Sequence, residues 1–338
     1  MEINPFRVLG NPLVSRSLAQ RLLAGERGAI ARAIRLLDDG DPTGTALLRE
    51  IYPAAAAARV IGVTGAPGSG KSTLVDRLIE AFRARGERVG VAAVDPSSPF
   101  TGGAILGDRI RMQRHAEDDG VFIRSLATRG HLGGLSASTL DALTVLGAAG
   151  FHTLLLETVG VGQDEVEVNR VADTVALIVA PGSGDAVQTL KAGVMEIAHL
   201  FVVNKMDQPG ADQTAREIEQ MLAFKDHGPG LPAAPGPATW TPPVVLAAAV
   251  EGRNIDQVVE ALDRHAEWLR SSGEDRRRRR DRARVAVQEA VRARVDADLA
   301  SGFPSALDEA AARVSGGSSD PRTEADAIVK ALGVRKPG

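Results

Sequence analysis

The string Gly65-Ala66-Pro67-Gly68-Ser69-Gly70-Lys71-Ser72-Thr73 has the residue types and spacing of a phosphate-binding loop. It fits G-x-x-x-x-G-K-[ST] at every fixed position. Glycines let backbone N–H groups turn inward around phosphate oxygens, and the N-terminus of the following helix adds partial positive charge. We expect Lys71 to contact the β- and γ-phosphates of a nucleotide, Ser72 to bind Mg²⁺ and Thr73 to contact the α-phosphate.

A second string, Asn204-Lys205-Met206-Asp207, has the pattern N-K-x-D at the end of an apolar run. The Asp207 carboxylate can accept hydrogen bonds from the ring N–H and the exocyclic amine of guanine, whereas adenine would leave it unpaired. Asn204 is placed to bridge the base and the phosphate loop, and the stem of Lys205 can lie over the purine. Backbone N–H groups of Ala248-Ala249-Val250 are the expected third contact. The pattern predicts GTP and GDP as ligands.

Glu157 follows another apolar run and is an expected ligand of Mg²⁺, through water, while the Gly160 N–H is placed to meet the γ-phosphate. In some GTPases a glutamine directly after this glycine orients the attacking water. Val161 stands directly after the glycine instead, and Gln163 lies further on. We therefore expect slow intrinsic hydrolysis, with no catalytic base identified.

Two aspartates are further candidates for the metal site. Asp95 ends the second predicted strand, and Asp108 follows a stretch that contains Gly102 and Gly103. This stretch is typical of a switch that becomes ordered around Mg²⁺ and the γ-phosphate. The alternative for both aspartates is helix capping or a solvated charge.

Short apolar runs alternate with segments of helical length through the middle of the chain. This alternation predicts an α/β fold, with a mostly parallel sheet covered by helices on both faces. Asp226–Pro243 is rich in proline and predicts a surface loop within this domain. The apolar runs are Val60–Thr64, Val89–Val94, Val121–Ile123, Thr153–Leu156, Thr174–Val179, Leu200–Val203 and Val244–Ala247.

We divide the chain into a helical N-terminal extension (1–56), a nucleotide-binding domain (57–271) and a charged helical C-terminal region (272–338). Apolar residues in the extension recur at three- and four-residue steps, as in an amphipathic helix pair. The C-terminal region opens with five consecutive arginines, Arg276–Arg280. We interpret them as a solvated face or a dimer contact, because no aromatic residues for stacking on bases stand nearby.

Composition excludes several classes of function. The chain has no cysteine, which rules out disulfides and thiolate metal sites. Its net charge of -3 gives no electrostatic case for nucleic acid or an anionic membrane. The apolar runs are too short to span a bilayer. The opening residues have no apolar signal core, so we expect a cytoplasmic protein.

Taken together, these motifs resemble the MeaB/ArgK family of P-loop GTPases, and the resemblance covers nearly the whole chain. Ala248 departs from it, since the family often has serine there. The matching strings are Thr64–Thr73, Val94–Ser98, Gly107–Arg109 with Met112, Arg129–Gly134, Glu157–Gln163 and Asn204–Asp207.

The resemblance implies a protein that binds GTP and Mg²⁺ and forms homodimers through its C-terminal helices. It further implies a chaperone that gates the loading and protection of adenosylcobalamin in methylmalonyl-CoA mutase or a related acyl-CoA mutase. Lys71, Asp95, Asp108 and Glu157 match family positions of the metal and hydrolysis site. Of these, Lys71, Asp108 and Glu157 are the expected catalytic residues. The expected metal ligands are Ser72, Asp95, Asp108 and Glu157.

Two other functions remain open. One is a transport-associated ATPase or kinase, against which the N-K-x-D pattern speaks. The other is a metal-delivery GTPase of the hydrogenase or urease maturation type. Such proteins need clusters of cysteine or histidine, whereas the six histidines here are scattered.

Overall fold

The computed structural model describes residues 17–95, 113–127, 137–158, 164–182, 197–226, 239–302 and 304–331. The chain forms two compact units, Met1–Arg282 and Ala283–Gly338. The first unit contains a β-sheet with its helices, and the described part of the second unit is helical.

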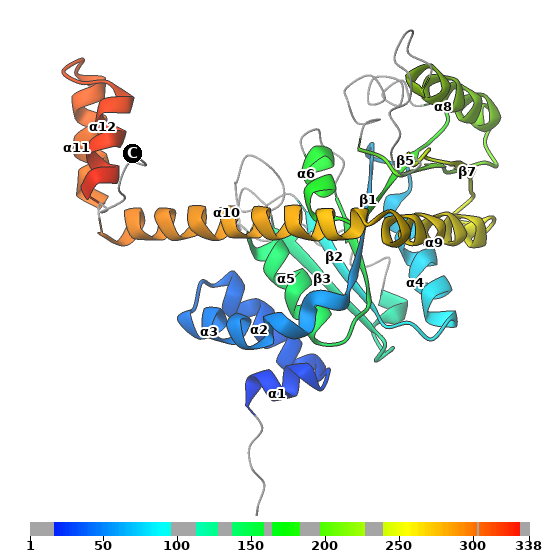
Figure 1. Cartoon of the computed structure of the whole chain (residues 1–338), viewed down its shortest axis with the longest axis horizontal. Coiled ribbons are helices and arrows are strands. Elements are labelled where there is room, and N and C mark those ends of the chain that lie inside the picture. The colour runs from blue at the N-terminus through cyan, green and yellow to red at the C-terminus, as the bar shows by residue number, and fades with distance from the viewer. Residues whose placement is uncertain are drawn as a thin grey trace, which may run out of the picture. The chain divides into compact units, whose positions relative to one another are not determined.

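The sheet has seven strands in the order β3-β2-β4-β1-β5-β6-β7, and all neighbouring strands are parallel (Figure 1). The predicted α/β fold with a parallel sheet is therefore confirmed, and each strand overlaps one of the predicted apolar runs. The strands are β1 (Arg59–Gly65), β2 (Val89–Asp95), β3 (Val121–Ala127), β4 (Thr153–Glu157), β5 (Thr174–Val179), β6 (Leu200–Val203) and β7 (Val244–Leu246).

Helices bury both faces of the sheet because successive strand residues point to opposite sides. Ala176 and Ile178 of β5 belong to a core cluster shared with the helices α4 and α9. Leu177 and Val179 of the same strand belong to a second cluster, shared with α8. The helices of this domain are α4 (Lys71–Ala84), α5 (Ala137–Ala148), α6 (Asp164–Val171), α8 (Ala211–Asp226) and α9 (Ile255–Ser272).

The N-terminal extension contains three helices where the sequence pattern predicts a pair. They are α1 (Leu18–Leu23), α2 (Arg27–Asp38) and α3 (Pro42–Ile51), followed by a 3₁₀ segment, η1 (Tyr52–Ala57). Gly25, at φ +77°, separates α1 from α2 in a left-handed conformation that few other residues adopt. The predicted apolar stripe on α2 is buried at Ile30, Ala33 and Ile34.

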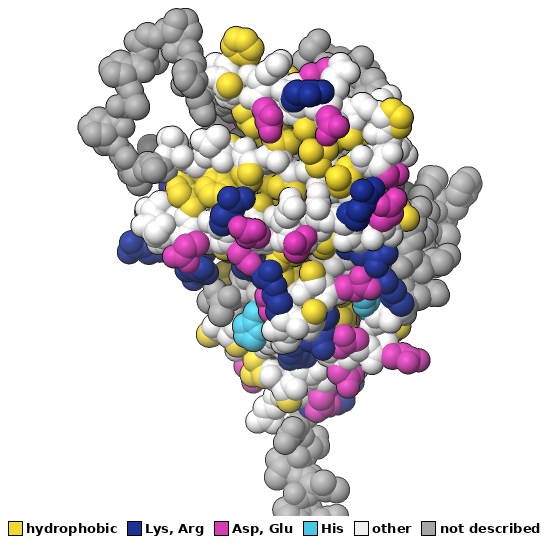
Figure 2. All heavy atoms as spheres, turned by 90° about the vertical axis from the view of Figure 1, so that its right-hand side faces the viewer, with side chains coloured by type: hydrophobic (Ala, Val, Ile, Leu, Met, Phe, Trp, Pro, Cys, Tyr) yellow, Lys and Arg dark blue, Asp and Glu magenta, His cyan; other side chains and the backbone are white. Residues whose placement is uncertain are grey.

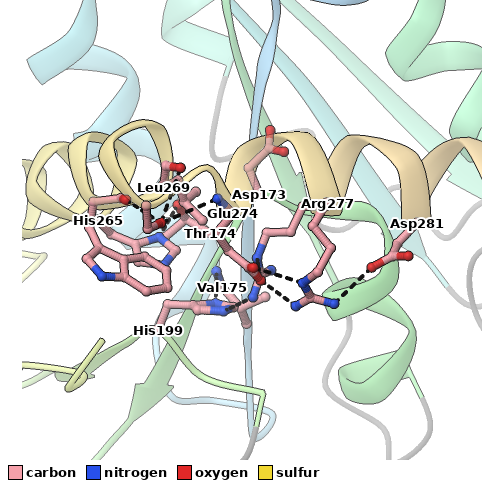
Figure 3. A network of polar contacts seen from close by, with 12 residues as sticks. Asp173, Thr174, Val175, His199, His265, Leu269, Glu274, Arg277 and Asp281 are labelled. Carbon is pink, nitrogen blue, oxygen red and sulfur yellow. Dashed lines mark hydrogen bonds and ion pairs between the residues drawn. The ribbon is translucent and has the colours of Figure 1, made fainter. Parts of the chain in front are cut away.

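The first turns of helix α10 (Glu274–Gly302) are fastened to the sheet next to the residues at which β5 and β6 begin (Figure 3). Arg282 donates to both carboxylate oxygens of Asp173, at 2.9 and 3.3 Å, just before β5 begins. Nη2 of Arg278 lies 2.5 Å from Nε2 of His199, just before β6. Nδ1 of the same ring accepts the Val175 N–H at 3.0 Å.

An aromatic cluster surrounds this attachment. The His199 and His265 rings lie 4.5 Å apart, and Trp240 and Trp268 pack on His265 with centroids at 4.8 and 5.6 Å. Burial, together with the charge of Arg278, lowers the pKa of His265 to about 3. Burial and the same charge also lower the pKa of His199 well below its ordinary value.

The arginine run Arg276–Arg280 divides between solvent and this joint. Arg277 is 64% exposed and pairs with Glu274 at 2.8 Å and Asp281 at 3.0 Å, both on its own helix. This agrees with a solvated face. Arg278 differs, since only 17% of its side chain is exposed and it packs against His199. A run of identical residues on a helix points in all directions, so one member meets the core.

In the second unit, the remainder of α10 is followed by α11 (Pro304–Ser315) and α12 (Pro321–Ala331). Arg313 and Glu324 join α11 to α12 through two hydrogen bonds, at 2.9 and 2.6 Å. Val287 and Val291, one turn apart on α10, are 64% and 58% exposed. Dimerisation through these helices stays a prediction.

None of the described helices combines the length and apolar character needed to cross a membrane. On the face drawn in Figure 2, basic and acidic side chains lie interspersed among the coloured residues. Such mixing is what a near-neutral net charge leads one to expect.

The His265 environment predicts that acid weakens folding. The unfolded chain takes up a proton on this histidine below about pH 6.5, but the folded chain does so only near pH 3. Stability is therefore lost as the pH falls below 6.5, by about 2 kcal/mol for this histidine between pH 7.5 and 5. His265→Gln should remove that part of the pH dependence of urea unfolding.

Fluorescence is a direct measure, because both tryptophans of the chain, Trp240 and Trp268, lie in this cluster. The change in unfolding free energy between the two pH values is compared for wild type, His265→Gln and the control His152→Gln, whose side chain is exposed. Equal pH dependence in wild type and His265→Gln would contradict the prediction.

Candidate functional site

The phosphate-binding motif lies between β1 and α4, the strand–loop–helix setting that gives it meaning. Gly65 and Gly70 have φ values of +142° and +94°. A Cβ at Gly65 would lie 2.1 Å from the Ile178 carbonyl oxygen, and one at Gly70 would lie 2.2 Å from Nδ2 of Asn204. Both positions therefore require glycine, and the loop's close packing against β5 and β6 depends on it.

Lys71, the first residue of α4, is 7% exposed and points back into this loop. Its Nζ donates to the carbonyl oxygens of Gly65 at 2.9 Å and Ala66 at 3.1 Å. The positive end of the α4 dipole and the lysine charge thus act on the same small region. This arrangement suits an anion with several oxygens, such as the phosphate chain of a nucleotide.

Ser72 and Glu157, both predicted as metal ligands, are brought together. Ser72 Oγ donates to Oε1 of Glu157 at 2.5 Å, and both side chains are buried. They meet because β4 pairs with β1 in a register that places Glu157 beside Val63. A hydroxyl and a carboxylate are the hard oxygen donors that Mg²⁺ prefers, so these residues fit the ion.

The other members of the predicted metal and γ-phosphate site are only partly described. Asp95 is the last residue of β2, next to β4, so its backbone lies at the same edge of the sheet as Glu157. Asp108 and Gly160 lie outside the described residues. Among the described residues, no group of three or more histidine, aspartate or glutamate side chains is placed to hold a metal.

Asn204 joins the phosphate side of the site to the base side. Its Nδ2 donates to the Ser69 carbonyl oxygen at 2.9 Å, and its Oδ1 accepts the Ala249 N–H at 3.0 Å. Asn204 is 2% exposed, so both bonds are shielded from water. The loops around Ser69 and Ala249 come from distant parts of the sequence, and this side chain bonds to both of them.

The rest of the N-K-x-D string forms a tight turn after β6. Lys205 has φ +60°, an unusual conformation for a residue with a side chain, and such strain is often found at functional sites. The Met206 N–H donates to the Ala247 carbonyl at 2.9 Å and fastens the turn to the end of β7. Asp207 is exposed at the end of this turn, where a ligand can reach it.

The third predicted base contact, Ala248–Val250, follows β7 in the same region. The Ala248 N–H donates to the Arg253 carbonyl at 3.2 Å, and the Ala249 N–H donates to Asn204. The loop is thus close to the base side of the site and is itself well held.

One buried pair at this site was not predicted from the sequence. The Thr158 hydroxyl donates to the Thr64 hydroxyl at 2.9 Å and ties the end of β4 to β1. Threonine is common in strands, and two hydroxyls that meet across a sheet leave no spacing signal. Only the register of β1 and β4 reveals them.

Comparison with known proteins identifies the family. The family described as "Methylmalonyl Co-A mutase-associated GTPase MeaB" matches residues 30–302. A Pyrococcus abyssi protein named as a GTPase is 45% identical over 324 residues, covering 93% of this chain and 96% of its own length. The GTPase ArgK of Escherichia coli is 37% identical over 261 residues, covering 75% of this chain and 76% of its own.

Two further likenesses extend the comparison. The protein named methylmalonic aciduria type A homolog, mitochondrial, of Caenorhabditis briggsae is 33% identical over 289 residues, covering 80% of this chain and 68% of its own. The crystal structure of a LAO/AO transport system kinase superposes with a TM-score of 0.65 at 26% identity, covering 94% of this chain and 97% of the other. The chain therefore belongs to the MeaB family of GTPases, enzymes that bind and hydrolyse a guanine nucleotide.

Proposed function

We propose that this protein uses GTP and Mg²⁺ to gate the loading and protection of adenosylcobalamin in an acyl-CoA mutase of the methylmalonyl-CoA mutase type. The observation that carries the proposal is the match of residues 30–302 to a family of mutase-associated GTPases. The relative named after methylmalonic aciduria type A supports the same partner class. A homodimer formed through the C-terminal helices is part of the proposal.

In this proposal the candidate residues divide the work on the nucleotide. Asp207 reads the guanine edge and Asn204 orders the base loop against the phosphate loop, while Lys71 neutralises charge on the β- and γ-phosphates. Ser72 and Glu157 would hold Mg²⁺, which would supply positive charge to the phosphate chain. Asp95, Asp108 and the Gly160 N–H complete the site.

A slow reaction is expected of this site. Lys71, Asp108 and Glu157 are the proposed catalytic residues, and their role is electrostatic. Val161 occupies the position from which a glutamine would orient the attacking water. Slow hydrolysis suits a protein whose GTP-bound state must persist while a partner loads its cofactor.

Guanine recognition is tested by Asp207→Asn. The amide replaces one acceptor by a donor, so preference should move from guanosine to xanthosine nucleotides. Competition of GDP, XDP and ADP for the purified protein measures this change, and it also separates the GTPase from a transport-associated kinase that uses ATP. Asp212→Asn, an exposed carboxylate on α8, is the matched control. Unchanged affinity for GDP in Asp207→Asn would count against the base site.

The metal site is tested by Glu157→Gln. The amide oxygen can still accept the Ser72 hydrogen bond, but the negative charge is gone, so Mg²⁺ should bind about 10- to 100-fold more weakly. A calorimetric titration of Mg²⁺ into the GDP complex measures the loss of Mg²⁺ affinity. The rate of GTP hydrolysis should fall together with this affinity. Glu267→Gln, at an exposed position of α9, should behave as wild type. A Mg²⁺ affinity equal to wild type would exclude Glu157 as a ligand.

The partner is tested with purified adenosylcobalamin-dependent mutases of the methylmalonyl, ethylmalonyl and isobutyryl types. We expect a complex with one of them, and cofactor transfer into it that differs between GDP and a non-hydrolysable GTP analogue. The visible spectrum of the cobalamin follows the transfer. Lys71→Ala should abolish the nucleotide dependence. Absence of a complex with all three mutases would overturn the chaperone proposal and leave the GTPase assignment intact.

A further inference from the structure

Arg77 of α4 holds the loop that is expected to meet the base. Its Nε donates to the Ala249 carbonyl oxygen and its Nη2 to the Val250 carbonyl oxygen, each at 2.9 Å. The third guanidinium nitrogen, Nη1, pairs with Glu80 one turn further along the helix at 3.0 Å. One planar group thus makes three directed contacts, two of them to consecutive carbonyls of the same loop.

The helix that supplies this arginine begins at the phosphate loop. Lys71 is its first residue, and Arg77 lies less than two turns later. The base loop is therefore attached to the phosphate side of the site in two ways. Asn204 fixes the Ala249 N–H from the inside, and Arg77 fixes the Ala249 carbonyl from the outside.

The guanidinium is itself held in place by a chain of ion pairs. Glu80, the partner of Arg77, also pairs with Arg114 at 2.5 Å. Arg114 in turn donates to Asp76 at 2.8 Å, and Asp76 is only 13% exposed. Side-chain hydrogen bonds to Asp76 raise the pKa of Arg114, which stays charged. Glu80 is thus fixed from its far side and can fix Arg77.

We propose that Arg77 is a positioning residue for guanine recognition, which orders the Ala248–Val250 loop before the nucleotide binds. A loop that is already ordered does not lose conformational entropy on binding, so ordering it tightens affinity without touching the ligand. Arginine suits this role because its planar fork reaches two carbonyls at once, whereas the point charge of lysine does not. The proposal rests on the base site of the proposed function.

The test is Arg77→Gln, compared with Arg85→Gln. Arg85 stands at the end of the same helix and pairs with Asp263 at 2.5 Å, so its loss removes an ion pair of this helix that lies away from the base loop. We expect Arg77→Gln to raise the dissociation constant of GDP about tenfold. The single-turnover rate of hydrolysis at saturating GTP should change by less than about twofold, because the phosphate side is untouched.

Arg77→Lys keeps the charge and should give an intermediate loss of GDP affinity, which keeps the proposal testable if Arg77→Gln folds poorly. Arg85→Gln should bind GDP as wild type does. An unchanged dissociation constant in both Arg77 variants would overturn the proposal, and so would an equal loss in Arg85→Gln. Asp207→Asn, measured alongside, separates failure of this proposal from failure of the proposed function. If Asp207→Asn alters base preference while the Arg77 variants keep the wild-type affinity for GDP, only the Arg77 proposal fails.

Discussion

The buried amide of Asn204 is the interaction on which the nucleotide site depends. It bonds to a carbonyl of the phosphate loop and to an N–H of the base loop, and all three residues involved are buried. Loss of such a side chain leaves two buried polar groups unpaired, each at a cost of about 1–3 kcal/mol. Gly70 belongs to the same constraint, because a side chain there would occupy the position of the amide nitrogen.

This amide can make both contacts only because the strands are parallel and in a fixed register. Gly65 of β1 pairs with Ile178 of β5. The next residue of β5, Val179, pairs with Val203 of β6, which pairs with Leu246 of β7. All four strands therefore end at one edge, and their loops meet there. β1 lies between β4 and β5 at the middle of the order, where the chain's connections diverge. Ligands of open α/β sheets bind at such a point.

The sequence predicted the parts of this arrangement that follow from a local pattern. All seven strands come from continuous apolar runs, since buried parallel strands need apolar residues on both faces. The phosphate loop and the N-K-x-D turn were found because glycine, lysine and aspartate have few substitutes there. Asn204 is expected to bridge the base and the phosphate loop. The structure shows its bonds to the phosphate loop and to the Ala249 N–H, and the contact with the base stays a prediction. The sequence predicts neither the role of Arg77 nor the Thr64–Thr158 pair. Arg77 bonds to backbone carbonyls, which every residue has, and two threonine hydroxyls that meet across a sheet have no characteristic spacing in the sequence. Arg278 shows the other limit, since tertiary packing decides which arginine of the run is buried. The break at Gly25 follows from the conformational freedom of glycine, which an apolar stripe does not register.

The length of the strands sets the distance between the attachment of α10 and the nucleotide edge of the sheet. β5 begins beside Asp173, where Arg282 fastens α10, and ends at the nucleotide edge six residues later. At the usual rise per residue, these ends are about 20 Å apart. No side chain spans that length, so a nucleotide cannot touch the joint of α10 directly. An influence of the nucleotide on this joint has to cross that distance, and β5 itself connects the two ends. The ion pairs along α4 are different, because they run from the base loop toward Arg114 on the nucleotide domain itself. Recognition of the base and attachment of α10 are thus held by separate sets of contacts, and variants of one set should leave the other intact.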